Sequence, residues 1–156
     1  MKKGILPAVL AGLLLVDPAA HAGDHVYKID SPVCKAECTS CHLAYPPQLL
    51  SAPDWRRLLS GLDRHFGTDA SVDAKALEAL SGYLELNAGR KRAATGIDSP
   101  RITTSTWFIR EHRKLPDTTW RSAAVGKASN CVACHTAADP GDFSERTRRV
   151  PVRRQP

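Results

Sequence analysis

The sequence predicts a mainly α-helical protein whose second half is largely irregular. Three segments carry apolar residues at the spacing of an amphipathic helix: residues 51–66, 71–89 and 105–116. Gly89 and Pro116 supply stops for the second and third of these segments. Beyond Pro116 the sequence shows no comparable periodic pattern. We therefore expect helices up to this point and little regular structure after it.

The first 22 residues have the pattern of a cleaved signal peptide. Lys2 and Lys3 precede an apolar run from Ile5 to Val16, which ends at Ala20-His21-Ala22, a sequence that a signal peptidase can read. The run of 12 residues is shorter than the roughly 20 that a membrane-spanning helix needs. We therefore predict cleavage after Ala22, export to the periplasm, and no stable membrane insertion of the mature chain.

The charge of the chain is mildly positive. The sequence has 22 basic and 16 acidic residues, and removal of residues 1–22 leaves a formal charge of +5. Much of this excess lies between Glu145 and Pro156, where five arginines accompany one glutamate. This basic stretch is interpreted either as a solvated carboxy-terminal tail or as a docking surface for an acidic partner. Export argues against a nucleic-acid partner.

Five cysteines require an explanation in an exported chain, where thiols usually pair as disulfides. An odd number leaves one cysteine over. Zinc ribbons also use two Cys-x-x-Cys pairs, but these typically lie about 15–20 residues apart. Here 89 residues separate Cys41 from Cys131, and a histidine follows each pair. Disulfides or zinc therefore leave the repeated Cys-x-x-Cys-His pattern unexplained.

Covalent haem attachment explains both copies of the pattern. In c-type attachment two thiols bond to the porphyrin vinyl groups, and the following histidine ligates the iron. The sequence therefore predicts two covalently bound haem c groups. The attachment and proximal-ligand residues are Cys38, Cys41 and His42 for haem 1, and Cys131, Cys134 and His135 for haem 2.

The sixth iron ligands must be sought among few residues. Methionine is excluded, because Met1 is the only methionine and leaves with the signal peptide. The mature chain offers His25, His65 and His112 beyond the two proximal histidines. His25 lies close to the new amino terminus, where we expect a surface residue.

We expect His65 to be the distal ligand of haem 1. It follows Leu58 by seven residues and Leu62 by three, so it would emerge from the apolar face at the end of a helix over residues 51–66. A buried core histidine is the alternative interpretation.

We expect His112 to be the distal ligand of haem 2. It lies four residues after Phe108, one helical turn along the same side, although its charged neighbours leave a solvated histidine as the alternative. His42 and His65 are 23 residues apart, as are His112 and His135. We therefore predict local pairing within each half.

Cys34 belongs to neither attachment motif. It precedes Cys38 by four residues, so in a helix both side chains would share one face. Three interpretations remain open: a small buried hydrophobe, a thiolate ligand of iron, or a disulfide between two chains.

The first half resembles the small class I cytochrome c fold. The likeness rests on an attachment motif near the start, a ligand just before the final helix, and the sequence Gly-Tyr-Leu within that helix. It implies that the final helix packs across the helix carrying the attachment cysteines. We therefore expect a haem 1 domain over residues 23–90, and a haem 2 domain over residues 91–156 that ends in the basic tail.

A closer resemblance covers most of the mature chain. The stretches ECTSCH, DWRRLLSGLDRHFG, ALSGYLELNAGRKR, TSTWFIREHRKLP and NCVACHTAADPGDFSE resemble the bacterial dihaem cytochrome c family. The resemblance implies a bis-histidine periplasmic electron carrier. It also implies a small monohaem cytochrome and a membrane cytochrome b as redox partners.

The expected function is a low-potential electron-transfer relay between redox partner proteins, rather than catalysis. Two nitrogen ligands on each iron leave no position for a substrate, and they give lower potentials than histidine with methionine. The alternative is a peroxidase or a sulfur-compound oxidoreductase with one open or Cys34-ligated iron. A haem-based sensor would need one weak, displaceable histidine.

Overall fold

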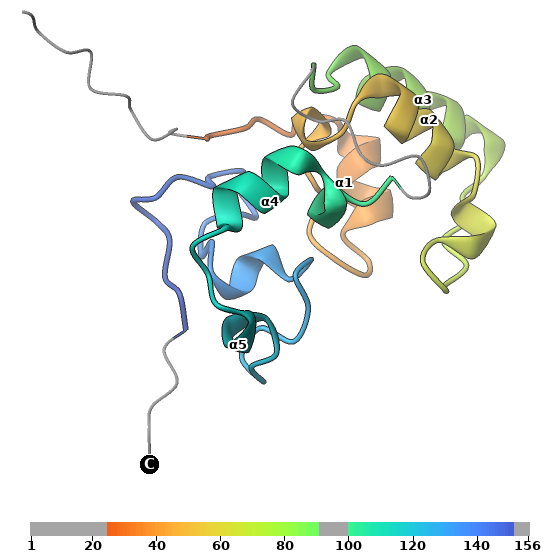
Figure 1. The fold of residues 1–156 in the computed structure, drawn as a ribbon. Coiled ribbons are helices and arrows are strands. Elements are labelled where there is room, and N and C mark those ends of the chain that lie inside the picture. Colours follow the sequence, from red (N-terminus) through yellow and green to blue (C-terminus); the bar gives the residue numbers. More distant parts are fainter. Residues whose placement is uncertain (1–24, 91–99, 152–156) are drawn as a thin grey trace, which may run out of the picture.

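The computed structural model describes residues 25–90 and 100–151, and it is helical as the sequence predicts. The helices are α1 (Pro32–Cys38), α2 (Ala52–Leu59), α3 (Ala74–Leu86), α4 (Thr106–His112) and α5 (Asp117–Trp120). Short 3-10 turns occupy Pro47–Leu49, Leu62–Arg64, Ile102–Thr104 and Cys131–Ala133. Figure 1 shows α2 and α3 side by side at one end of the molecule, α5 toward the opposite end, and α4 between them.

The helices of the first half begin at side-chain caps. The Ser31 hydroxyl accepts a hydrogen bond from the Cys34 N–H at the start of α1, and Ser51 accepts from the Asp54 N–H at the start of α2. The Asp73 carboxylate does the same for Ala76 in α3. These bonds satisfy backbone donors that a helix start leaves unpaired, and so fix where each helix begins.

The main core lies where α3 packs against α1 and α2. The buried residues of this cluster are Ile29, Cys34, Ala44, Leu50, Trp55, Leu59, Leu80 and Leu84. The Trp55 indole N–H donates to the Pro47 carbonyl oxygen at 2.8 Å, which ties α2 to the loop before it. The final helix of the first half thus packs against the helix that ends in Cys38, which confirms the arrangement expected from the class I resemblance.

Three predicted helix ends are wrong, one of them that of α4, which ends at His112 rather than at Pro116. The helix expected over residues 51–66 ends at Leu59, and a separate 3-10 turn at Leu62–Arg64 leads to His65. Ser60 and Gly61 separate the two, because the Gly61 N–H bonds back to Leu58 rather than continuing the α-helical pattern. The third helix of the first half ends at Leu86, not at Gly89, whose N–H instead donates to the Leu50 carbonyl oxygen.

The second half has a small core. Ser105 caps α4, and Phe108, Val125, Cys134 and Ala138 are its buried apolar residues in the described ranges. Long loops with local turns connect α4, α5 and the second attachment motif. This matches the expectation of a largely irregular half, in which packing around a bound group must supply much of the folding energy.

The amino-terminal segment pairs with the second half. The Tyr27 N–H donates to the Gly141 carbonyl oxygen, and the Phe143 N–H donates to the His25 carbonyl oxygen, each at 2.8 Å. The division into haem domains near residue 90 remains a prediction. The segment that precedes the first attachment motif nevertheless contacts the segment that follows the second attachment motif.

The basic carboxy-terminal stretch is not a detached tail over its described part. The Arg149 N–H donates to the Cys134 carbonyl oxygen at 2.7 Å, and the Thr136 hydroxyl donates to the Thr147 carbonyl oxygen at 2.8 Å. The backbone up to Arg149 is therefore held against the second attachment motif, although Arg146, Arg148 and Arg149 are exposed, as expected of a solvated segment. Residues 152–156 lie outside the described ranges.

The contact between Tyr27 and Gly141 predicts an unequal effect of two glycine substitutions. Gly141 and Gly126 both have left-handed backbone angles, with φ of 97° and 70°. A β-carbon at Gly141 would collide with the Tyr27 carbonyl oxygen, whereas one at Gly126 would meet nothing within 4 Å. Gly126→Ala should cost about 1–2 kcal/mol of unfolding free energy through backbone strain alone. Gly141→Ala should cost about 1–3 kcal/mol more.

Denaturant unfolding of both variants, followed by the loss of helical circular dichroism, measures this difference. Equal destabilisation of the two variants would show that the pairing of residues 25–27 with residues 141–143 contributes nothing to stability.

Candidate functional site

The structure brings His42 and His65 together. His42 follows the turn after α1, and His65 follows the 3-10 turn after α2. Their ring centroids lie 6.2 Å apart, and the ring planes are inclined by 33°. The two residues reach this position from loops on different elements, rather than from one helix.

His112 and His135 form a second pair with the same separation. His112 is the last residue of α4, and His135 follows the 3-10 turn at Cys131–Ala133. Their ring centroids lie 6.1 Å apart, and the planes are nearly perpendicular at 78°. The predicted local pairing therefore agrees with the proximity of the rings in both halves.

The separation in both pairs fits a metal held between two imidazoles. Each imidazole nitrogen lies about 2 Å from a metal that it ligates, and its ring centre about 1 Å further out, so trans ring centres lie about 6 Å apart. The distances of 6.2 and 6.1 Å match this arrangement. By this criterion the four histidines could hold two haem irons, one between the rings of each pair.

Hydrogen bonds fix which ring nitrogen is free in two of the histidines. His42 Nδ1 donates to the Leu43 carbonyl oxygen at 2.7 Å, and His112 Nδ1 donates to the Phe108 carbonyl oxygen at 2.8 Å. A donating Nδ1 leaves Nε2 with the lone pair that a metal binds. His135 Nδ1 is buried with no hydrogen-bond partner in the described residues, so this ring is held by packing instead.

Burial favours the neutral form of three of the four paired imidazoles. It lowers the pKa of His65, of His112 and of His135 below the usual range for histidine. The neighbouring His42 lowers the pKa of His65 further, and His112 does the same for His135. Neutral imidazole is the form that binds a metal, so these rings are in the correct protonation state without a preceding loss of a proton.

Each cysteine pair lies on a short stretch of backbone beside its proximal histidine. Cys38 ends α1 and Cys41 lies in the turn that follows, whereas Cys131 begins a 3-10 turn that ends just before Cys134. The His135 N–H donates to the Cys131 carbonyl oxygen at 2.8 Å, which closes the second motif into one compact turn. Burial raises the pKa of the Cys131 thiol to about 11.

Cys34 is part of the core. It is 1% exposed within α1, on the same face as Cys38 as predicted, and the interaction with Cys34 raises the pKa of Cys38. A disulfide between two chains needs an accessible sulfur, so that interpretation is wrong for this structure. The position agrees with a small buried hydrophobe.

Aromatic rings packed on the histidines were missed by the sequence analysis. Their ring centroids lie 4.9 Å apart for Tyr45 and His42, 4.7 Å for Phe66 and His65, 5.7 Å for Trp120 and His112, and 5.4 Å for Phe143 and His135. Phe66 directly follows His65 in the sequence, a signal that could have been used. Trp120 and Phe143 are each eight residues from their histidine, and no helical or strand period links them.

The surface position expected for His25 is wrong in part. Its ring stacks on Tyr27 at a centroid distance of 6.1 Å and meets the edge of Trp107 at 5.8 Å. His25 therefore packs against aromatic residues of both halves, and it joins neither histidine pair.

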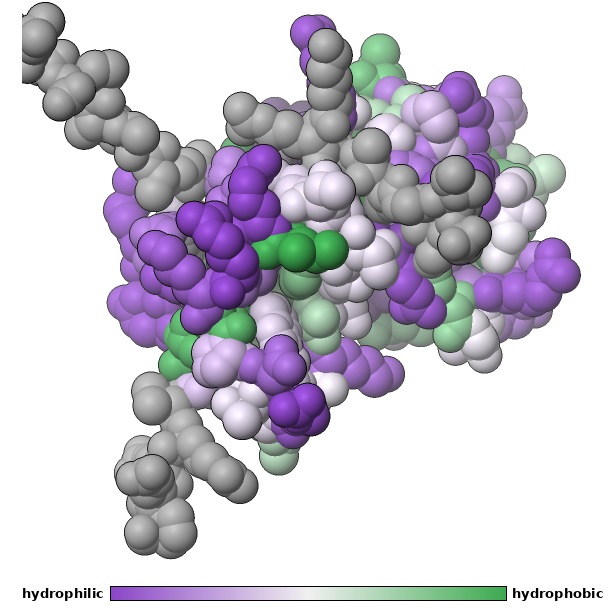
Figure 2. Space-filling model, in the orientation of Figure 1, coloured by the Kyte–Doolittle hydropathy of each residue, from purple (hydrophilic) through white to green (hydrophobic). Residues whose placement is uncertain are grey.

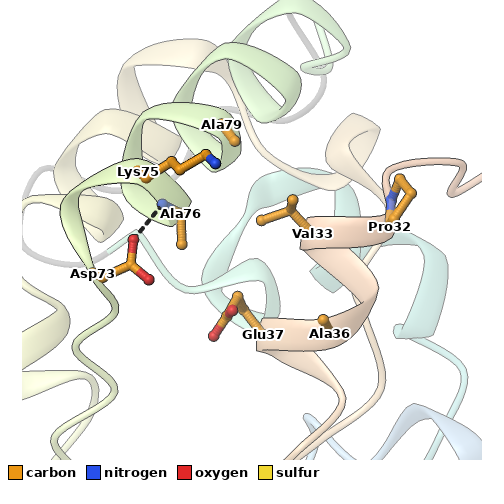
Figure 3. Close-up of a pocket in the computed structure, with 8 residues that line it drawn as sticks. All are labelled: Pro32, Val33, Ala36, Glu37, Asp73, Lys75, Ala76 and Ala79. Carbon is orange, nitrogen blue, oxygen red and sulfur yellow. Dashed lines mark hydrogen bonds between the residues drawn. The ribbon is translucent and has the colours of Figure 1, made fainter.

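Other features of the described residues lie apart from these sites. A hollow of about 350 Å³ between α1 and the start of α3 is lined by Pro32, Val33, Ala36, Glu37, Asp73, Lys75, Ala76 and Ala79 (Figure 3). No paired histidine or attachment cysteine lines it.

In the described residues, no group of three or more His, Cys, Asp or Glu side chains could hold a metal ion directly. No helix within residues 25–90 and 100–151 is long and apolar enough to cross a membrane.

Comparisons with known proteins agree with this arrangement. The family described as dihaem cytochrome c matches residues 34–143, from Cys34 to Phe143. The chain belongs to the dihaem cytochrome c family. As a member it carries two covalently attached haem c groups, and the family supports a role as a cytochrome electron carrier.

Solved structures support the same assignment. The chain is 36% identical to a diheme cytochrome c from Rhodobacter sphaeroides, with a TM-score of 0.67 over 75% of this chain and 99% of the other. It is also 36% identical to a diheme cytochrome c from Shewanella baltica, with a TM-score of 0.68 over 77% of this chain and 92% of the other. No curated protein matches the chain.

The geometry of this cytochrome predicts which cysteines hold haem. A Cys131→Ala/Cys134→Ala variant should carry one haem per chain instead of two, as should a Cys38→Ala/Cys41→Ala variant, because each loses both thioether bonds to one porphyrin. Cys34→Ala should keep both haems and lose about 1 kcal/mol of stability, as is typical for a buried substitution. A pyridine haemochrome assay against protein concentration gives the count. Loss of a haem from Cys34→Ala alone would contradict the assignment.

Proposed function

We propose that this cytochrome is a periplasmic relay that passes single electrons between redox partner proteins through two bis-histidine haem groups. The observation that carries the proposal is the separation of the paired histidines, 6.2 Å for His42 with His65 and 6.1 Å for His112 with His135. In this proposal His42 and His135 are the proximal ligands, and His65 and His112 the distal ones. The cysteine pairs that hold the porphyrins are Cys38 with Cys41, and Cys131 with Cys134.

Ligation by two imidazoles favours electron transfer over catalysis. Bound haem supplies a one-electron iron couple at each site. Imidazole on both faces leaves no position for a substrate, and ligands that stay the same in both oxidation states keep the reorganisation small. With methionine excluded from the mature chain, we expect both potentials to be lower than those of cytochromes with histidine and methionine ligands.

The proposed location rests on the amino-terminal sequence. Residues 1–22 lie outside the described residues, and their charged, apolar and small-residue regions are those of a secretory signal peptide. Covalent haem attachment to such chains takes place after export. The proposed mature protein therefore begins at Gly23 and acts in the periplasm.

The charge distribution suggests where partners dock. Residues 23–90 contain seven basic and nine acidic residues, whereas residues 100–156 contain eleven basic and five acidic ones. Figure 2 shows hydrophilic side chains gathered over α4 and the carboxy-terminal segment beside it. An acidic partner should therefore approach the second half, and higher ionic strength should weaken that approach. The family resemblance suggests a small monohaem cytochrome and a membrane cytochrome b as the partners.

The two histidine pairs predict two distinguishable paramagnetic centres. The ring planes of His42 and His65 are inclined by 33°, and those of His112 and His135 by 78°. When the two imidazole planes are nearly perpendicular, the electronic environments along the two directions in the haem plane become similar. Nearly parallel imidazole planes make these two environments differ more. The oxidised protein should therefore give two different low-spin electron paramagnetic resonance signals, the more axial one from haem 2. A single low-spin signal that accounts for both irons would contradict this geometry.

Replacement of one distal histidine should open one iron. His65→Ala should convert haem 1 to high spin and leave the haem 2 signal unchanged, because only the first histidine pair loses a ligand. His112→Ala should do the reverse. Electron paramagnetic resonance of the oxidised variants measures both signals, and reduced variants should bind carbon monoxide at the opened iron.

His25→Ala is the matched control for these variants, because His25 belongs to neither pair. It should retain two low-spin haems and should not bind carbon monoxide. Persistence of two low-spin haems in His65→Ala or His112→Ala would refute that ligand assignment. Carbon monoxide binding by the unaltered protein would favour a sensor or an enzyme with an open iron.

A further inference from the structure

Tyr45 connects the first histidine pair with the second attachment motif. Its hydroxyl donates a hydrogen bond to the Ser129 carbonyl oxygen at 2.7 Å, across 84 positions of the sequence. Ser129 precedes Cys131 by two residues. The same side chain packs on the His42 ring with a centroid distance of 4.9 Å and an angle of 33°. One residue thus touches a proposed ligand of haem 1 and the backbone that leads to haem 2.

The environment of the hydroxyl agrees with this position. Tyr45 is partly buried. The Ser129 carbonyl oxygen can only accept a hydrogen bond, so the phenol hydroxyl is the donor.

The backbone on either side of Tyr45 is held firmly. Ala44 is 5% exposed, and Pro46 and Pro47 are fully buried, so the tyrosine lies between buried neighbours. The Pro47 carbonyl oxygen also accepts the hydrogen bond from the Trp55 indole. Motion of Tyr45 relative to the first core is therefore restricted by packing and by the two proline rings.

The receiving loop is also held by its own hydrogen bonds. The Asn130 side-chain amide donates to the Val125 carbonyl oxygen at 3.0 Å, and Val125 is buried. The Ala133 N–H donates to the Asn130 carbonyl oxygen at 3.2 Å, which joins this loop to the turn that begins at Cys131. A shift at Ser129 would therefore be passed on to the second attachment motif.

We propose that Tyr45 is a positioning residue that fixes the two haem groups relative to each other and so sets the rate of electron transfer between them. The inference rests on the proposed relay function. One ferrous iron is oxidised as the other, ferric, iron is reduced, so no bond is broken and no proton has to move. Tyr45 itself is neither oxidised nor reduced, and acts through His42 and the backbone at Ser129.

The other aromatic contact near haem 1 does not join the two sites in the same way. The Arg101 guanidinium lies 3.9 Å from the centre of the Phe66 ring, and Arg101 belongs to the second half of the chain. Arg101 is exposed, however, and lies 30 residues before the first cysteine of the second motif. Tyr45 has the more direct connection.

Two substitutions separate the hydrogen bond from the ring contact. Tyr45→Phe removes the bond to Ser129 and keeps an aromatic ring beside His42. Tyr45→Leu removes both contacts. Tyr83→Phe is the matched control. It also removes only a hydroxyl, which accepts a hydrogen bond from the Asp30 N–H and donates one to the Asp30 carboxylate, both within the first half. Each purified holoprotein is reduced by one electron with a laser-triggered donor, and the internal equilibration between the haems is followed by absorbance.

Tyr45→Phe should slow internal equilibration by about fivefold, the factor equivalent to one net hydrogen bond of about 1 kcal/mol. Its haem 1 resonance signal should stay unchanged because the ring contact with His42 remains. Tyr45→Leu should slow the step further and alter the haem 1 signal, whereas Tyr83→Phe should match the unaltered protein. An unchanged rate in Tyr45→Phe would overturn the proposal, even if Tyr45→Leu fails to fold.

Failure of this inference can be told apart from failure of the relay. A high-spin haem in the unaltered protein would refute the relay before any variant is tested. Two low-spin haems with equal rates in Tyr45→Phe and the unaltered protein would leave the relay intact and remove Tyr45 from it.

Discussion

The spacing of about 6 Å within each pair of imidazole rings is the constraint on which the rest of the structure depends. It requires His42 and His65 to approach from two different loops, and His112 and His135 to approach from the end of α4 and from a 3-10 turn. Backbone carbonyl groups orient two of these rings, at Leu43 and Phe108. In the proposed relay, each pair of rings would hold one iron and leave it no position for a substrate, so that only an electron would pass through the site.

This constraint also explains why the two halves of the chain look so different. The first half builds a core from α1, α2 and α3, and this core holds the loops of the first histidine pair in place. The second half buries few apolar residues of its own within the described ranges, and depends on contacts with other segments. These are the pairing of Tyr27 with Gly141 and the hydrogen bond from Tyr45 to Ser129, and within the second half itself Arg149 bonds to Cys134. A covalently attached porphyrin adds the apolar surface that so small a core lacks.

Site residues that are recognised by short, fixed spacings along the chain could be predicted from the sequence. The Cys-x-x-Cys-His motifs and the equal 23-residue separation within each histidine pair are of this kind. The end of α2 at Leu59 was not predictable from apolar spacing, because Leu62 and Phe66 continue the helical pattern although the backbone turns at Gly61. Phe143 on His135 and His25 on Trp107 depend on long-range folding, which leaves no period in the sequence. The exposure of the basic stretch around Arg149 agrees with its charge, but charge alone does not reveal the backbone hydrogen bond from Arg149 to Cys134.

The central claim is that each chain holds two irons, both closed on either face by imidazole. A near-infrared magnetic circular dichroism spectrum of the oxidised, purified protein tests it most directly, because the position of the charge-transfer band reports the axial ligands of each low-spin haem. If both haems have two histidine ligands, the spectrum should show bis-imidazole bands whose intensity corresponds to two haems per chain. A high-spin band, a thiolate band, or an intensity that corresponds to one bis-imidazole haem would contradict it.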